Sequence, residues 1–286
     1  MILGTCLSFQ DVLDSIILSI FAITVKFGKD SDWPCIRMSL WLNMEGLGDV
    51  NDANARCLSA RFPQLWSQWQ LLDSILPTGG FAHSFGLEAA MQAHLVTTTD
   101  DLETYVIHVL ENAGSLLLPF ICAITASPDA QTWRRLDRLL NAMLTNEVSR
   151  KASTAQGSAL MRVAASVFSE IPCLKTMRGE ALSSGEFYFH HAPVFGLVCG
   201  LLGFDAETTQ RAYMFVTMRD IMSAATRLNL VGPLGAAVLQ HQVASVAESL
   251  STKWMNRGVD EACQTCPLLD TVQGCHNYLF SRLFCS

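Results

Sequence analysis

Apolar residues recur at helical spacing along most of the chain that follows residue 60. Over 102–124 and again over 133–144 they follow one another at intervals of one or three, which places them on one face of an α-helix. Asp100 with Glu103 three positions later predicts the N-terminal cap of the first helix. Asp129 predicts the start of the second helix.

The remaining helices are predicted from charge, small residues and helix-starting residues. In the second helix, four charged residues fall outside the apolar stripe: Arg134, Arg135, Asp137 and Arg138. A third helix is predicted over 147–168, and its small residues, Gly157 among them, allow a neighbouring helix to approach closely. Pro193, Asp205 and Pro233 predict further helix starts. Because strand-like alternation is nearly absent, we predict an all-α fold, a single-domain helical bundle.

Composition excludes several classes of protein. Hydrophobic residues make up 50% of the 286 positions and charged residues only 16%, with a net charge of −7. Such a chain is too apolar to be disordered. An acidic chain without a Lys/Arg block is not expected to bind nucleic acid or an anionic membrane surface. Too few charges to cover the surface indicate that apolar surface is buried against other subunits.

A helical membrane protein is the alternative that this apolar composition leaves open. Three stretches lack charged residues, 112–128, 187–204 and 228–247, and the last two approach the length of a membrane span. Both contain histidine or amide side chains and proline, so we disfavour insertion. The apolar run 16–27 has no basic residue before it and does not resemble a signal peptide. We expect a cytoplasmic protein whose ten cysteines are reduced.

No catalytic motif is present. The Walker, dinucleotide, zinc-protease and nucleophile-elbow patterns are all missing, so we expect no catalytic residue and no cofactor. A helical enzyme with an unrecognised site stays as an alternative. Adjacent His190 and His191 are expected to be a partly buried pair with satisfied hydrogen bonds rather than metal ligands, since neighbouring side chains diverge.

Four potential zinc ligands fall within fourteen positions near the C-terminal end of the sequence: Cys263, Cys266, Cys275 and His276. Their residue types suit a closed tetrahedral site. The last two are adjacent, however, and a single C-x-x-C is a weaker indication than two. We therefore treat them as weak candidates and expect little tightly bound zinc or nickel.

The most informative segment is 71–88, LLDSILPTGGFAHSFGLE. Its motif loop contains Pro77, Gly79, Gly80, His83 and Ser84. Proline ends the preceding helix, the glycines permit positive φ, and Ser84 is expected to cap a new helix with Glu88 in its first turn. We interpret the segment as a helix–loop–helix corner. Anion binding at the new helix start is the alternative, disfavoured because no Lys or Arg is near in the sequence.

This segment resembles the hallmark of the urease accessory protein F family. Other segments are similar to successive family motifs in the same order: 147–160 (EVSRKASTAQGSAL), 190–196 (HHAPVFG), 223–228 (SAATRL), 267–270 (PLLD) and 278–284 (YLFSRLF). The similarity is strongest to plant members. It covers 51–286, with a C-terminal interaction tail over about 267–286, whereas residues 1–50 form an N-terminal extension outside the match that we expect to be dispensable.

The resemblance implies a non-enzymatic maturation factor for urease, the dinuclear nickel enzyme. Family members dimerise and join accessory protein D, called H in some bacteria. The pair recruits accessory protein G, a GTPase that carries nickel, and GTP hydrolysis is coupled to delivery of the metal into apo-urease. In this scheme the chain is the scaffold and regulates the GTPase.

The resemblance also assigns residues to a partner interface. The tail residues Tyr278, Ser281, Arg282, Leu283 and Phe284 match a family segment associated with the D/H partner. An arginine flanked by aromatic and aliphatic side chains is also typical of an interface hot spot. The alternative is a short helix packed on its own core.

Overall fold

The structure, a computed structural model, describes residues 65–286. Every regular element in this range is helical, and no strand occurs in it, so the all-α prediction is confirmed. After a helix over 65–72, the elements are η2 (Gly80–Ala82), α4 (Leu87–Gln92), α5 (Thr99–Ala126), α6 (Ala130–Met143), α7 (Glu147–Val167), α8 (Pro172–Ser184), α9 (His191–Leu201), α10 (Ala206–Arg227), α11 (Pro233–Trp254), η3 (Val259–Glu261), α12 (Pro267–Cys275) and η4 (His276–Tyr278). The predictions about residues 1–50 lie outside the described residues.

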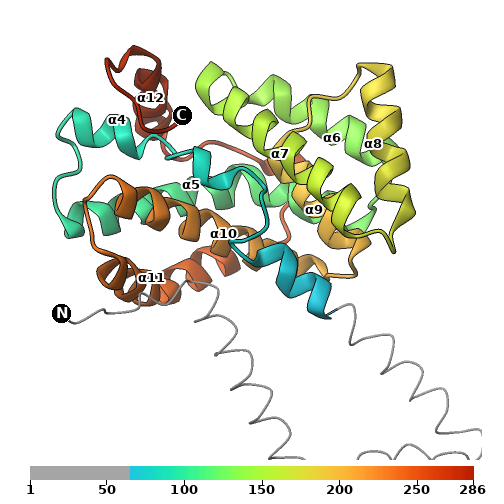
Figure 1. Ribbon diagram of the computed structural model, residues 1–286, viewed down its shortest axis with the longest axis horizontal. Coiled ribbons are helices and arrows are strands. Elements are labelled where there is room, and N and C mark those ends of the chain that lie inside the picture. Colours follow the sequence, from blue (N-terminus) through green and yellow to red (C-terminus); the bar gives the residue numbers. More distant parts are fainter. Residues whose placement is uncertain (1–64) are drawn as a thin grey trace, which may run out of the picture. The chain divides into compact units, whose positions relative to one another are not determined.

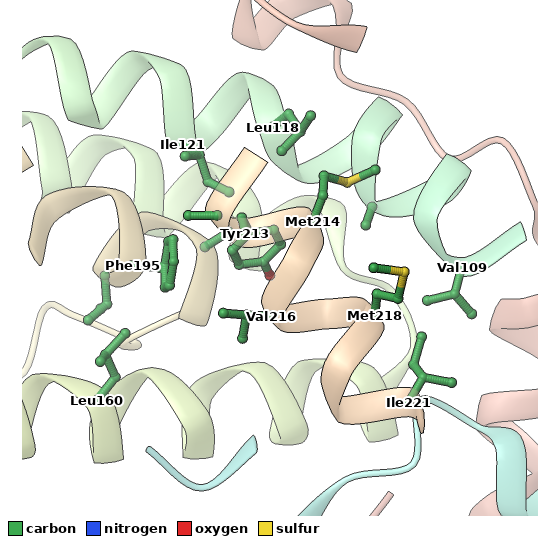
Figure 2. Packing of buried hydrophobic residues seen from close by; sticks show 14 of the residues in the cluster. Val109, Leu118, Ile121, Leu160, Phe195, Tyr213, Met214, Val216, Met218 and Ile221 are labelled. Atoms are coloured by element: carbon green, nitrogen blue, oxygen red, sulfur yellow. The ribbon is translucent and has the colours of Figure 1, made fainter. Parts of the chain in front are cut away.

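The bundle is built around α5. This helix packs against α9, α10 and α11, while α7 packs on α9 and the shorter α12 packs on α4 and α7 (Figure 1). In Figure 2 the side chains of α10, among them Tyr213 and Met214, lie next to Leu118 and Ile121 of α5 and Phe195 of α9. These residues are buried, and each such side chain removed from water contributes about 1.5–3 kcal/mol before ordering costs. The apolar stripes read from the sequence therefore form one continuous core.

α5 is the one helix within 65–286 that is long and apolar enough to cross a membrane. Most of its apolar window is buried inside the bundle, against the three helices named above. Burial in a protein core favours the same composition as burial in lipid, so one helix of this kind is weak evidence for a membrane span. The packing of α5 supports the interpretation that we preferred from the sequence.

α7 and the segment that leads into α9 meet at the small residues predicted for close approach. A Cβ atom added to Gly157 would lie 2.0 Å from the carbonyl oxygen of Phe189. Only glycine fits at this distance, because a methyl group and a carbonyl oxygen need more than 3 Å of separation. The absence of a side chain at Gly157 is what lets α7 contact this segment.

The helix starts predicted at Asp129, Asp205 and Pro233 are confirmed. The start predicted at Pro193 is shifted, because α9 already begins at His191. Asp129 and Asp205 are the N-caps of α6 and α10, accepting hydrogen bonds from first-turn N–H groups. The prediction for Asp100 is wrong. α5 begins at Thr99, and a capping box joins Thr98, whose Oγ1 accepts from the Asp101 N–H at 3.1 Å, with the Asp101 carboxylate. Thr98 and Asp101 are three positions apart, as are Asp100 and Glu103, so the sequence pattern alone could not distinguish the two pairs.

Asp137 is buried, although it falls outside the apolar stripe of its helix. Its carboxylate accepts hydrogen bonds from the N–H groups of Tyr188, Phe189 and His190 at 2.5, 3.1 and 2.7 Å. Burial raises the pKa of this carboxyl group, and the three hydrogen bonds oppose the shift. Asp137 thus holds the irregular chain before α9 against α6, a role that helical periodicity cannot indicate.

Candidate partner-binding site

The motif loop turns the chain sharply between the helix over 65–72 and α4. Gly79 and Gly86 have φ of +84° and +85°, the left-handed region that glycine adopts most easily. Gly80 lies against α10, where an added Cβ would come within 2.2 Å of Asp220 Oδ2. The helix–loop–helix corner predicted from the sequence is present, and it is fixed on α10.

Two arginines of α10 lie against this loop. Arg219 donates to the carbonyl oxygen of Leu72 at 2.7 Å and pairs with Asp220 at 2.8 Å. Arg227 donates to the carbonyl oxygen of Phe81. No Lys or Arg is near the loop in the sequence, but in the folded chain two arginines from a distant segment lie beside it. Both guanidinium groups bind main-chain carbonyls of the corner, which ties it to the bundle.

The C-terminal tail returns to the motif loop, so the two candidate segments of the sequence are brought together. The N–H and the hydroxyl of Ser84 both donate to the carbonyl oxygen of Ser286 at 2.7 Å. His83 Nδ1 lies 2.7 Å from the Ser286 hydroxyl oxygen. The N–H of Cys285 donates to the carbonyl oxygen of Ala82 at 2.8 Å. We call the motif loop, 77–88, together with the tail, 267–286, the loop–tail unit.

Glu88 of α4 is the buried centre of the loop–tail unit. Its two carboxylate oxygens accept hydrogen bonds from the N–H of Leu283 at 2.6 Å and the N–H of Phe284 at 3.1 Å. His276 Nε2 lies 3.1 Å from the same carboxylate. From the sequence Glu88 was recognised only as a first-turn acid. The pairing with the tail crosses about 200 positions and leaves no local sequence pattern.

Ser84 was expected to cap α4, and this is wrong. The N-cap is Gly86, which offers no side chain. The Ser84 hydroxyl donates to Ser286 and accepts from the Glu88 N–H only at 3.4 Å. Its short side chain thus binds the tail in preference to the helix.

The tail divides its side chains between the solvent and the bundle. Tyr278 is 89% exposed, Phe280 fully exposed and Leu283 53% exposed, and Ser281 and Arg282 are exposed as well. Phe284 is buried, and the guanidinium of Arg227 lies 4.4 Å from the centre of its ring. Of the five tail residues singled out from the sequence, four therefore face solvent and Phe284 anchors the segment.

The four weak metal candidates are not brought together. Cys263 and Cys275 are exposed, Cys266 is half-buried, and all three are free thiols. His276 is buried, with Nε2 facing Glu88. Among residues 65–286 no group of three or more His, Cys, Asp or Glu side chains is placed to hold a metal ion.

His190 and His191 diverge, as expected for neighbours in sequence. The ring of His190 is buried between Ser153 Oγ at 3.1 Å and Asn141 Oδ1 at 3.2 Å. His191 instead faces the rings of Phe195 and Tyr213. Burial lowers the pKa of both histidines to about 4, so both are neutral near pH 7. The interpretation of a satisfied pair is confirmed for His190.

Two hollows adjoin the loop–tail unit. A cavity of about 260 Å³ lies among α5, α7, α10 and α12, lined by apolar side chains and by polar groups such as His83, His191 and Ser286. A groove of about 460 Å³ lies between α4, α5 and α12, with the exposed Leu95 and Leu268 in its lining. Part of its lining comes from α12, the helix that precedes the exposed apolar residues of the tail.

A second apolar surface lies on α10 and α11. Phe215, Leu234 and Val238 are 43%, 80% and 50% exposed. No charged residue occurs in α11 from Pro233 to Ala247, although most residues of this stretch are exposed to solvent. The first charge, Glu248, pairs with Arg211 of α10 at 2.7 Å, one helical turn from Phe215. We call this surface the α10–α11 face.

Fold and surfaces together define a class, an all-α protein with two exposed apolar surfaces of the kind that bind other proteins. The sequence model of the UreF family matches residues 96–244, about half of the chain. The chain therefore belongs to the urease accessory protein F family, as the resemblance of its motifs indicated, and has a role in urease maturation. The family is one of maturation factors and not of catalysts.

Relatives extend this similarity across plants and bacteria. Urease accessory protein F of Arabidopsis thaliana is 68% identical over 221 residues, which are 77% of this chain and 92% of the relative. Urease accessory protein F of Oryza sativa subsp. indica is 70% identical over 222 residues, 78% and 85% of the two chains. Urease accessory protein UreF of Mycobacterium marinum is 30% identical over 219 residues, 76% and 96% of the two chains.

Proposed function

We propose that the chain is a cytoplasmic, non-enzymatic scaffold that acts with accessory protein D (H) and the GTPase accessory protein G. The assembly supports insertion of nickel, as cargo, into apo-urease, and the scaffold regulates the GTPase. Membership of the family supports the role in maturation. The observation that carries the finer proposal is the loop–tail unit, which holds an apolar segment outward on a fixed main chain.

The tail surface is the proposed contact for accessory protein D. Tyr278, Phe280 and Leu283 expose apolar area that costs free energy in water, and a partner with an apolar cleft would remove it. Arg282 lies among them and is exposed, so it is available to a carboxylate or carbonyl on the partner. Phe284 and the backbone hydrogen bonds to Glu88 hold the segment in place from below.

Affinity measurements with purified accessory protein D test this contact. We expect Arg282→Ala to weaken binding by about 2 kcal/mol or more and Phe280→Ala to act in the same direction. Leu182→Ala, an exposed leucine of α8 that is far from the tail in sequence, is the matched control and should bind normally. Full affinity of both tail variants would contradict the assignment. Capture of accessory protein G by the pair, with and without GTP, tests the wider assembly.

The α10–α11 face is the proposed contact between two copies of the chain. Each copy carries a net charge of −7, so a self-contact needs a surface free of unpaired like charge. From Pro233 to Ala247 the outward side of α11 carries no charged residue. The first carboxylate after this stretch, Glu248, pairs with Arg211, which also pairs with Glu207 of α10. A stable dimer needs roughly 800 Å² per copy, so the neighbouring Phe215 surface has to take part.

Sedimentation of the isolated chain tests the dimer. We expect Val238→Glu to halve the measured mass, because the two new carboxylates would be buried without partners. Leu182→Glu, an equally exposed apolar position on α8, should leave the mass unchanged. A wild-type chain that sediments as a monomer at all concentrations would refute the dimer but leave the accessory protein D contact standing.

A further inference from the structure

Glu88 has an environment that helix capping does not explain. It is 3% exposed, and within the described residues neither lysine nor arginine pairs with it. A buried carboxylate is costly unless hydrogen bonds replace its water. Here the replacement comes from the tail: two consecutive main-chain N–H groups and the ring of His276.

The two N–H groups belong to the residues at which the tail changes sides. Leu283 is exposed, whereas Phe284, the next residue, is buried beneath Arg227. Fixing both N–H groups on one carboxylate fixes the direction of the main chain between them. The direction of the main chain decides which side chains face solvent. Glu88 therefore determines the orientation of the tail through hydrogen bonds to its main chain.

A second residue of α4 also binds the main chain of the tail, at the surface of the protein. Gln92, one turn further along α4, donates from Nε2 to the carbonyl oxygen of Ser281 at 3.0 Å. Its side chain is exposed. Glu88 and Gln92 together bind the main chain of 281–284 from one face of α4, and no side chain of that stretch is needed for these hydrogen bonds.

We propose that Glu88 is the positioning residue of the docking surface. Its carboxylate holds the tail in the conformation that presents Tyr278, Phe280 and Leu283 to a partner with an apolar cleft and an acceptor for Arg282. This inference rests on the proposed function of the tail. Without Glu88 the tail samples other conformations, and the apparent Kd rises in inverse proportion to the fraction of chains that stay competent to bind.

The test compares Glu88→Gln with Glu180→Gln in the full chain. Glutamine keeps the size of the side chain but can accept with only one of its two terminal atoms. We expect amide hydrogen exchange in 279–286 to rise at least tenfold and the Kd for accessory protein D to rise at least tenfold. Exchange in α5, α9 and α10 should not change. Glu180, exposed on α8, should show neither effect.

A tether separates positioning from a general loss of stability. The N–H of Cys285 binds the carbonyl oxygen of Ala82 and both side chains are exposed, so Ala82→Cys places a second thiol beside a natural one. Oxidation by glutathione disulfide joins the two sulfurs and reduces the oxidant to two thiols. The disulfide holds the tail without Glu88, so we expect it to restore partner affinity in the Glu88→Gln variant. Reduction should remove the restored affinity.

Several outcomes would overturn the inference. Unchanged tail exchange in Glu88→Gln, raised exchange with unchanged affinity, or a tether that restores nothing would each contradict it. A wild-type chain that does not bind accessory protein D would instead refute the proposed function. If Glu88→Gln does not fold, Gln92→Ala decides, because the exposed Gln92 side chain donates to the main chain of the tail. Both exchange and Kd should then rise about twofold, and no change in either overturns the inference.

Discussion

The bundle core and the loop–tail unit are stabilised by different kinds of interaction. In the core, large apolar side chains of α5, α9 and α10 are removed from water (Figure 2). In the loop–tail unit, polar groups bind main chain: Glu88 holds 283–284, Ser84 holds Ser286, and Arg227 holds the loop. Only a few apolar side chains, such as Phe284, anchor the tail.

This difference explains how the tail can display apolar residues at all. A segment held by its side chains buries them, as α5 does. A segment held through its main chain keeps its side chains for another surface. The same division predicts that changes in the bundle alter global stability, whereas changes in the loop–tail unit alter the surface that the protein presents.

The largest loss of stability should come from the bundle, at Asp137. Asp137→Ala leaves three N–H groups without an acceptor, and those of Phe189 and His190 are buried, at about 1–3 kcal/mol each. We expect the free energy of unfolding to fall by more than about 3 kcal/mol in urea titrations. Arg135→Ala, exposed on the same helix, should cost less than about 0.5 kcal/mol. A small effect at Asp137 would show that the chain before α9 is held by its aromatic packing.

Acid should weaken the protein through its buried histidines. The pKa of His83, His190 and His191 is lowered to about 4 by burial, against an ordinary value of 6.5. Between pH 6.5 and 4 the unfolded chain binds protons that the folded chain does not, so stability falls as the pH falls, by roughly 2–3 kcal/mol per histidine. Above pH 6.5 these groups add no pH dependence.

A histidine variant sharpens this test. His190→Gln should flatten the loss of unfolding free energy between pH 6.5 and 4, because one proton uptake is removed. His241→Gln, at an exposed position of α11, should leave the pH profile of the wild type unchanged. An equally steep profile in both variants would mean that His190 titrates normally.

The cap of α5 should have an intermediate effect. Thr98→Ala removes one half of the capping box that begins the central helix. We expect a loss of about 1 kcal/mol in the free energy of unfolding. Asp100→Ala, the residue that the sequence pattern favoured, should cost less than Thr98→Ala, and the reverse order would restore the original assignment of the cap.

The smallest effect on stability should come from the tail. Phe280 is fully exposed, so Phe280→Ala should change the free energy of unfolding by less than about 0.5 kcal/mol. A larger loss would show that Phe280 packs on the chain in solution and that the tail is not organised as described. Thermal unfolding of the wild type and of the Phe280→Ala variant in the same buffer distinguishes the two outcomes.

The fold could be predicted because helical periodicity is a local property. A helix over 147–168 is predicted from the sequence, and α7 spans Glu147–Val167. The caps at Asp129 and Asp205 follow from residues adjacent to the helix start. Asp137 was misplaced because its partners lie in a segment some fifty positions away.

The site could be predicted only in pieces. The glycines of the motif loop and the exposed Tyr278 and Arg282 were recognised as separate segments. The sequence could not show that these segments contact each other, because the contact depends on the folded bundle bringing α4 and α12 together. Glu88 was passed over for the same reason: an acid in a first helical turn has an ordinary local explanation, and its true partners lie far along the chain.

The hydrogen bond between Ser84 and Ser286 joins residues 202 positions apart, so it forms late during synthesis of the chain. A ribosome adds residue 286 long after the motif loop has emerged, and the intervening helices must be packed before the two ends of this contact can meet. An unfinished or truncated chain can therefore possess a complete helical core and still lack the surface built by the tail. Formation of that surface therefore follows the packing of the helices that lie between the motif loop and the tail.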